Sequence, residues 1–199
     1  MWKGPVVAEY RTLMPIADEL QGERVVVRAY RLEDAEALHE AIEESRDHLR
    51  PWMAWAREHQ SLDETRDFIL RCQARWLLRE GFTSGVFDVH TGRLLGGSGF
   101  RPVDWDVRTF EIGYWLRAGA EGHGYVTEST RLLTDYLFDQ LAAQRVQILC
   151  DARNTRSASV PARLGFTREA LLRHYVRAVD GSLENTLVFA MIPSDPRWP

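Results

Sequence analysis

The chain has 199 residues, of which 45% are hydrophobic and 27% charged, as is typical of a single globular domain. Its 29 acidic and 25 basic residues give a net charge of −4, whereas proteins that bind nucleic-acid backbones usually carry a basic excess. No apolar run approaches the roughly 20 residues of a membrane-spanning helix. Cys72 and Cys150 are too few for a disulfide framework or a zinc site. We therefore expect a cytoplasmic protein without metal, membrane or nucleic-acid partners.

The first half of the chain predicts an arm, one strand, two helices and two further strands. The clearest boundary is a capping box, in which Ser61 is followed three residues later by Glu64. Hydrophobic periodicity and turn residues place the other elements. They are an irregular arm at 1–21, a strand at 22–30, a helix from Leu32 to before Pro51, a helix from Ser61 to Gly81, and strands at Phe82–Val89 and Leu94–Arg101.

The second half alternates strands with helices and ends in a hairpin signalled by Asp180-Gly181. The expected elements are strands at Thr109–Leu116 and Arg145–Asp151, a helix from Val126 to Leu141, a short helix from Asn154 to Gly165, and strands at Thr167–Val179 and Leu183–Ile192. Pro161 removes a helical N–H, so we expect the short helix to be kinked or to start late. A strand–helix–strand unit within a meander predicts a mixed α/β fold, of the α+β kind. The chain is predicted to be a single domain over residues 1–199, with a core of about residues 22–192.

Glycines cluster between a predicted strand and a predicted helix, at Gly119, Gly122 and Gly124. Glycines allow tight turns and let successive backbone N–H groups approach an anion, and the following helix adds the positive end of its dipole. This pattern predicts a pyrophosphate site, although glycines at such a junction can also form a simple turn. It is not a Walker loop, because no Gly-Lys-Ser/Thr follows.

A second polar segment follows the next strand along the chain and carries Asn154, Arg156 and Ser157. If the two strands are parallel neighbours, both strand-to-helix turns open at the same edge of the sheet. The range 152–168 holds four arginines and no carboxylate, so the acidic average of the chain conceals one basic stretch. That stretch suits one compact polyanion better than a nucleic-acid backbone.

The order and spacing of several motifs resemble the GNAT superfamily of acyl-CoA-dependent N-acyltransferases, and most closely its branch of ribosomal-protein N-terminal acetyltransferases. The motifs are RLEDAEAL, LRPWMAWA, LLGGSGF, EIGYWL, GHGYVTE, NTRS and RLGF. The resemblance covers residues 23–192. It implies a mostly antiparallel, seven-stranded mixed sheet with a splayed parallel strand pair and about four helices.

The resemblance also implies that acetyl-CoA binds where the two parallel strands separate. The family's Arg/Gln-x-x-Gly-x-Gly/Ala loop corresponds to residues 121–126, from which Glu121 and Val126 depart. The implied cofactor-binding residues are Leu116, Arg117, Glu121, Gly122, His123, Gly124, Tyr125, Val126, Thr127, Asn154, Arg156 and Ser157. Leu116 and Arg117 are expected to pair their backbone with the pantetheine arm. For His123, a solvent-facing side chain is the main alternative.

For catalysis, Glu111 is the candidate general base and Ser157 the candidate acid, because a carboxylate suits the base role in amine acetylation. Many relatives place a proton-donating tyrosine where this chain has Pro161. Glu111 can equally be a strand-surface residue, and Ser157 a helix cap or a CoA contact. Trp52 and Trp55 are the candidate substrate-binding residues, with buried packing as the alternative.

The expected function is N-acetyl transfer from acetyl-CoA to a primary amine, by direct transfer in a ternary complex. The acceptor is either a protein N-terminal α-amine or a small molecule such as a polyamine, an amino acid or an aminoglycoside-like compound. A non-catalytic acyl-CoA-binding module on the same fold is a further alternative. Because acyltransferases of this class are often dimers, a homodimer through the C-terminal strands is possible.

Overall fold

One mixed sheet with helices on both faces forms the architecture of this computed structural model, which describes residues 10–57, 60–178 and 181–198. Within these ranges the helices are α1 (Ala35–Leu49), α2 (Leu62–Leu77), α3 (Tyr125–Asp139) and α4 (Thr155–Arg163). The strands are β1 (Glu19–Gln21), β2 (Val25–Ala29), β3 (Phe82–Asp88), β4 (Leu94–Asp104), β5 (Thr109–Leu116), β6 (Arg145–Asp151), β7 (Thr167–Arg177) and β8 (Leu183–Met191). The short helix η3 (Ala54–Arg57) follows α1, and η4 (Ala118–Ala120) follows β5.

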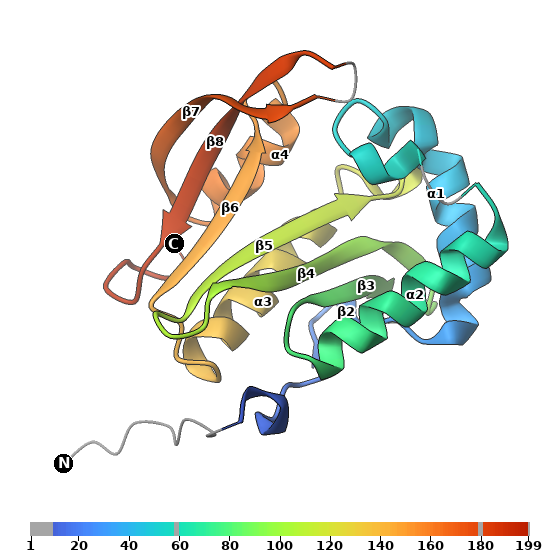
Figure 1. Cartoon of the computed structure of the whole chain (residues 1–199), viewed down its shortest axis with the longest axis horizontal. Coiled ribbons are helices and arrows are strands. Elements are labelled where there is room, and N and C mark those ends of the chain that lie inside the picture. Colours follow the sequence, from blue (N-terminus) through green and yellow to red (C-terminus); the bar gives the residue numbers. More distant parts are fainter. Residues whose placement is uncertain (1–9, 58–59, 179–180, 199) are drawn as a thin grey trace.

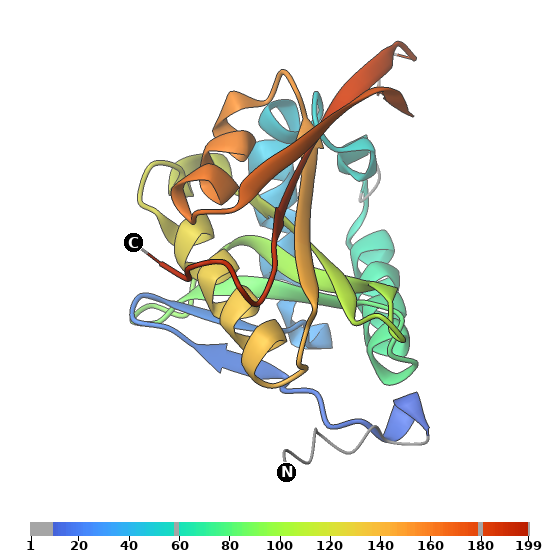
Figure 2. The ribbon, with the colours of Figure 1, turned by 90° about the vertical axis from the view of Figure 1, so that its left-hand side faces the viewer.

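The strands form a single sheet in the order β1-β2-β3-β4-β5-β6-β8-β7. Every neighbouring pair is antiparallel except β5 and β6, which are parallel. Figures 1 and 2 show α3 and α4 on one face of the sheet and α1 and α2 on the other. The mixed fold predicted from the sequence is confirmed.

The sheet contains eight strands rather than the seven that the resemblance implied. The additional strand, β1, lies at the end of the segment that was predicted to be an irregular arm. Its three residues pair with residues 26–28 of β2. A three-residue strand is too short to display the alternation by which strands are recognised in a sequence. Residues 1–9 of the predicted arm and Asp180 of the predicted hairpin turn lie outside the described residues.

Alternation along β5 sorts its side chains between the two faces of the sheet. Phe110 and Ile112 are buried in the larger hydrophobic core, which β5 shares with α3. A smaller core beneath α1 and α2 contains Leu38, Ile42 and Ile69. Ser61 accepts a hydrogen bond from the Glu64 N–H at the start of α2, which is one half of the predicted capping box. The Glu64 carboxylate accepts from the Gln60 N–H rather than from that of Ser61.

The parallel pair separates after a very short ladder. Residues 109–111 of β5 pair with residues 145–147 of β6, and no later residue of β5 has a partner in β6. Beyond this point β6 continues to pair with β8, and β5 with β4. The edge of β5 that faces β6 is therefore without a strand partner from Ile112 onward. This confirms the splayed pair and places an opening in the middle of the sheet.

Gly97 of β4 gives space to an aromatic side chain of the neighbouring strand. It lies directly opposite Trp115, and a Cβ atom at Gly97 would come within 2.3 Å of the Trp115 indole nitrogen and 2.9 Å of the Tyr30 hydroxyl. No Cβ contact of that length is tolerated without movement of the neighbour. The Trp115 indole therefore packs directly against the backbone of Gly97, which has no side chain.

We expect Gly97→Ala to lower the free energy of unfolding by about 1–3 kcal/mol, because the added methyl group displaces packed aromatic rings. The measurement is urea denaturation. Gly81→Ala is the matched control, since a Cβ atom there meets nothing within 4 Å. Equal stability of the two variants would contradict this account of β4.

Candidate functional site

A cavity of about 680 Å³ lies at the opening between β5 and β6. Its walls come from the C-terminal end of α1 and the turn after it, the end of β5, the loop before α3, and α4. Ten of the twelve predicted cofactor residues line it, namely Leu116, Glu121, Gly122, Gly124, Tyr125, Val126, Thr127, Asn154, Arg156 and Ser157. The structure thus brings together two segments that are separated in the sequence by helix α3.

The loop before α3 presents a row of backbone donors. Gly122 and Gly124 have φ angles of +79° and +80°, in the left-handed region that glycine adopts without strain. None of the backbone N–H groups of residues 122–127 has a hydrogen-bond partner within the described part of the chain, and Gly124 caps α3 without a side-chain bond. Unpaired N–H groups at the positive end of a helix dipole form an anion site.

Arg24, which the sequence analysis missed, holds this loop from behind. Its guanidinium donates to the carbonyl oxygen of His123 at 2.8 Å and pairs with the Glu128 carboxylate at 2.8 Å. Burial alone raises the pKa of Glu128, but hydrogen bonds from Arg24 outweigh it and hold the pKa below its ordinary value. His123 itself does not line the cavity. Its ring stacks on Tyr125, with ring centroids 5.7 Å apart.

Arg117 does not reach the cavity, contrary to the expectation that it contacts the cofactor. Its backbone N–H donates to Leu95 of β4 at 2.9 Å, and its buried guanidinium pairs with Glu40 and Glu44 of α1. Ser45 of α1 accepts a hydrogen bond from the next backbone N–H at 3.0 Å. Arg117 therefore attaches the end of β5 to α1 and positions the loop that follows.

Two of the four arginines of the basic stretch are paired with acids. Arg156 forms an ion pair with Glu121 at 2.8 Å, and Arg153 forms ion pairs with Asp151 and Glu184. Arg163 donates to the Thr127 hydroxyl at 3.0 Å. Arg168 lies on β7 and does not line the cavity. Acids therefore compensate Arg153 and Arg156, whereas Arg163 and Arg168 have no acidic partner among the described residues.

Ser157 lies in the first turn of α4 beside Tyr114 of β5, a second residue that the sequence analysis missed. Pro161 has no N–H to donate to the carbonyl of Ser157, and the Tyr114 hydroxyl donates to that oxygen at 2.9 Å. The Ser157 hydroxyl oxygen lies 3.4 Å from that of Tyr114. Burial raises the pKa of Tyr114, so its hydroxyl stays protonated as a donor. Alternation along β5 could have identified Tyr114, because it places this residue on the cavity face.

Helix α4 contains Pro161 but begins at Thr155, immediately after its cap Asn154, so it does not start late. The Asn154 side chain accepts a hydrogen bond from the Ser157 N–H at 3.0 Å. Cys150 lies nearby on β6, and burial raises the pKa of its thiol to about 11. At neutral pH this thiol is protonated and is a poor nucleophile.

Glu111 does not line the cavity and lies where β5 and β6 separate. Its carboxylate accepts hydrogen bonds from Arg101 at 2.9 and 3.1 Å and from Gln147 at 3.0 Å. Strand alternation places it on the opposite face of β5 from Ile112 and the α3 core. The base assignment stays a prediction.

The two candidate tryptophans occupy different positions. Trp52 follows α1 and lines the cavity with 39% of its surface exposed. Trp55 does not line it and packs edge-on against Trp115, with ring centroids 5.5 Å apart. Because Trp115 lines the cavity, Trp55 supports its aromatic wall from behind.

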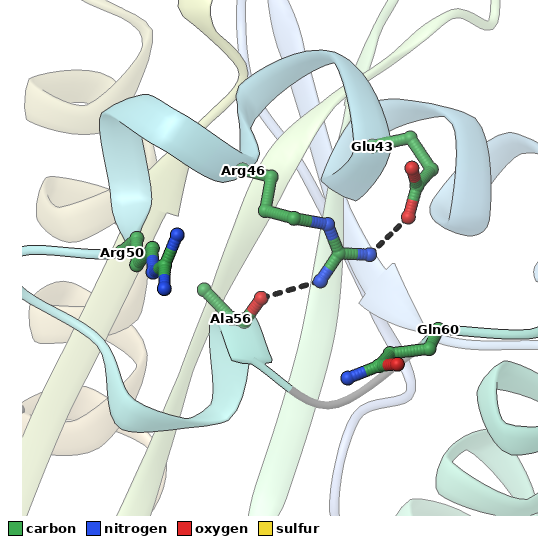
Figure 3. Close-up of a pocket in the computed structure, with 5 residues that line it drawn as sticks. All are labelled: Glu43, Arg46, Arg50, Ala56 and Gln60. Atoms are coloured by element: carbon green, nitrogen blue, oxygen red, sulfur yellow. Dashed lines mark hydrogen bonds and ion pairs between the residues drawn. The ribbon is translucent and has the colours of Figure 1, made fainter.

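A second cavity, of about 550 Å³, lies beside the C-terminal half of α1 and contains none of the predicted site residues. Figure 3 shows Arg46 pointing toward both the Glu43 carboxylate and the carbonyl of Ala56, to which it donates at 2.6 Å. Among the described residues, no group of three acidic, His or Cys side chains could hold a metal ion. In the same ranges, no helix is long and apolar enough to cross a bilayer.

Comparisons with known proteins agree with this geometry. A family model described as an acetyltransferase (GNAT) domain matches residues 24–167. YdaF of Bacillus subtilis, a proposed ribosomal N-acetyltransferase, is 32% identical over 76% of this chain and 82% of its own length. The ribosomal protein uS5-alanine N-acetyltransferase of Escherichia coli is 26% identical over 95% of this chain and 96% of its own.

Among solved structures, the microcin C7 self-immunity acetyltransferase MccE, in complex with acetyl-CoA and AMP, superposes with a TM-score of 0.81. It is 22% identical, and the match covers 86% of this chain and 93% of that one. At this identity the likeness concerns the fold. The family match spans most of the chain and includes the cavity-lining loop and the whole of α4. The chain therefore belongs to the GNAT family of acetyltransferases and is an N-acetyltransferase that uses acetyl-CoA.

Proposed function

We propose that this enzyme acetylates a protein N-terminal α-amine by direct transfer from acetyl-CoA in a ternary complex. The observation that carries the proposal is the splayed β5–β6 pair with a row of unpaired N–H groups at one side of the opening. The ribosomal-protein acetyltransferases among its relatives support the choice of acceptor.

The residues of the cavity fit the two chemical parts of CoA. The N–H groups of residues 122–127 and the N-terminus of α3 suit its phosphates, because they supply donors and a positive dipole. The unpaired edge of β5 up to Leu116 suits the amide groups of the pantetheine arm, which need backbone partners. Bound there, acetyl-CoA supplies the activated acetyl group.

The proposed roles of the enzyme's own side chains divide between the two faces of the sheet. Glu111 lies at the separation point on the face away from α3, where we assign it as the base that takes a proton from the attacking amine. Gly113, the next residue on that face, has nothing within 4 Å of its Cβ position, which leaves room for an amine. Ser157, on the cavity side, is assigned to donate a hydrogen bond to the departing thiolate. Tyr114 holds Ser157 in place.

Trp52 and Trp115 are the proposed contacts of the acceptor, and Trp55 supports Trp115 from behind. Aromatic rings offer rigid apolar surface, which suits the first side chains of a peptide without selecting a charge. Their position at the cavity wall nearest α1 separates the acceptor from the phosphate-binding loop.

We expect a ten-residue peptide with a free N-terminus to be acetylated faster than the same peptide with a blocked N-terminus and one internal lysine. An α-amine, with a pKa of about 7.7–8.0, is more often neutral than a lysine at about 10.4. Release of CoA thiol and the mass of the product measure the reaction. A polyamine, an amino acid and an aminoglycoside complete the panel.

Acetylation confined to the small amines would contradict the N-terminal acceptor and favour the small-molecule alternative. Tight acetyl-CoA binding without CoA release from any acceptor would favour a non-catalytic acyl-CoA-binding module.

Glu111→Gln should lower kcat by about 10- to 100-fold and leave the Kd of acetyl-CoA unchanged, because the amide cannot accept the proton. The defect should shrink as the pH rises above about 8, where an α-amine is already neutral. Initial rates across pH 6.5–9.5 and calorimetric titration measure these effects.

Glu169→Gln is the matched control. Glu169 also accepts two hydrogen bonds from one arginine, Arg145, at 2.7 and 2.9 Å, but it lies on β7 outside the cavity. If both variants lose the same activity, or if the loss in Glu111→Gln does not vary with pH, Glu111 is not the base.

A further inference from the structure

The Glu121 carboxylate lies in the cavity between two nitrogen-bearing side chains from opposite walls, the imidazole of His48 and the guanidinium of Arg156. One oxygen lies 3.0 Å from Nε2 of His48 on α1, and the other lies 2.8 Å from the Arg156 guanidinium on α4. Glu121 itself is only about one-third exposed, whereas the Arg156 side chain is 76% exposed. The contacts of Glu121 therefore extend across the cavity, and its ion-pair partner on α4 is largely exposed.

Glu121 also immediately precedes the row of unpaired N–H groups at residues 122–127. The family pattern has Arg or Gln at this position, either of which can donate to a phosphate, and an ionised glutamate cannot. A negative charge therefore stands at the entrance of the loop that suits the CoA phosphates. Within the described residues, the guanidinium of its partner Arg156 has no hydrogen-bond partner other than this acid.

We propose that Glu121 sets the affinity for CoA by competing with its phosphates for Arg156. Phosphates that enter the loop are repelled by the carboxylate, and they gain Arg156 only after its ion pair with Glu121 is broken. The inference rests on the proposed function, because it requires the CoA phosphates to bind at residues 122–127. It concerns this chain's departure from the family pattern.

The same competition acts on the product. The product CoA carries the same phosphates as acetyl-CoA. When Glu121 forms its ion pair with Arg156 again, the phosphates lose that cation, which favours release of CoA at the end of each cycle. Product release limits turnover in many enzymes, and a weaker hold on the phosphates then raises turnover. Glu121 thus exchanges cofactor affinity for faster release.

The test is calorimetric titration of acetyl-CoA into wild-type enzyme and into the variants Glu121→Gln, Arg156→Gln and the double variant, at low and high salt. Glu36→Gln is the matched control, because Glu36 is an exposed glutamate of α1 that does not line the cavity. S-acetylpantetheine, which has the pantetheine arm but no phosphate, is titrated as the second ligand.

We expect Glu121→Gln to tighten acetyl-CoA binding by about three- to tenfold at low salt, and less at high salt. In the Arg156→Gln background the same change should have an effect below about twofold, since the contested cation is gone. Neither Glu121→Gln with S-acetylpantetheine nor Glu36→Gln with acetyl-CoA should alter the Kd by more than about twofold.

Unchanged or weaker acetyl-CoA binding by Glu121→Gln overturns the inference and leaves the proposed function intact. Equal tightening toward S-acetylpantetheine also overturns it, because the effect then does not involve phosphate. If wild-type enzyme fails to bind acetyl-CoA at all, the proposed function fails and the inference fails with it.

Discussion

The separation of β5 from β6 is the constraint around which the rest of the molecule is arranged. Each of the two strands keeps an antiparallel partner on its outer side, β4 for β5 and β8 for β6, so the sheet stays intact while its centre opens. Opening it leaves backbone groups of β5 without strand partners, and buried backbone groups must find partners elsewhere. A ligand with amide groups can satisfy them. The cavity is thus a gap in the hydrogen bonding of the sheet as well as a hollow in its surface.

Three contacts between distant segments keep that gap in shape. Tyr114 joins β5 to the first turn of α4 across the opening, and Pro161 makes the contact possible by leaving the Ser157 carbonyl free. Arg117 attaches the end of β5 to α1, and Arg24 fixes the loop before α3. The Tyr114 hydroxyl and the Arg117 guanidinium are at least partly buried, where a lost hydrogen bond is costly, whereas Arg24 is exposed. The loop between them can therefore leave its own N–H groups unpaired.

Local patterns in the sequence predicted the helices, most strands and the glycine-rich loop, because these depend on residues close together in the chain, whereas the splayed pair was implied by the family resemblance. The same patterns could not predict the pairing of charges. Arg156 and Glu121 are 35 positions apart, and Arg24 and Glu128 are 104 apart, so no count of charges within a window reveals them. The ion pairs of Arg117 could not be predicted for the same reason: its partners lie on a helix more than 70 residues earlier. The sequence identified Glu111 as a candidate base, but it could not predict that Glu111 lies outside the cavity, because that depends on how the strands are arranged in the fold.

The bare backbone of β4 beneath Trp115 has a consequence for how this enzyme can diversify. Gly97 lies outside the cavity, yet the absence of its side chain allows the Trp115 indole to pack closely against β4 and so affects how far the aromatic wall protrudes into the cavity. With Trp115 as a proposed contact of the acceptor, the room for an acceptor then depends in part on a side chain that is absent from the neighbouring strand. A residue that touches no acceptor can in this way influence which acceptors fit.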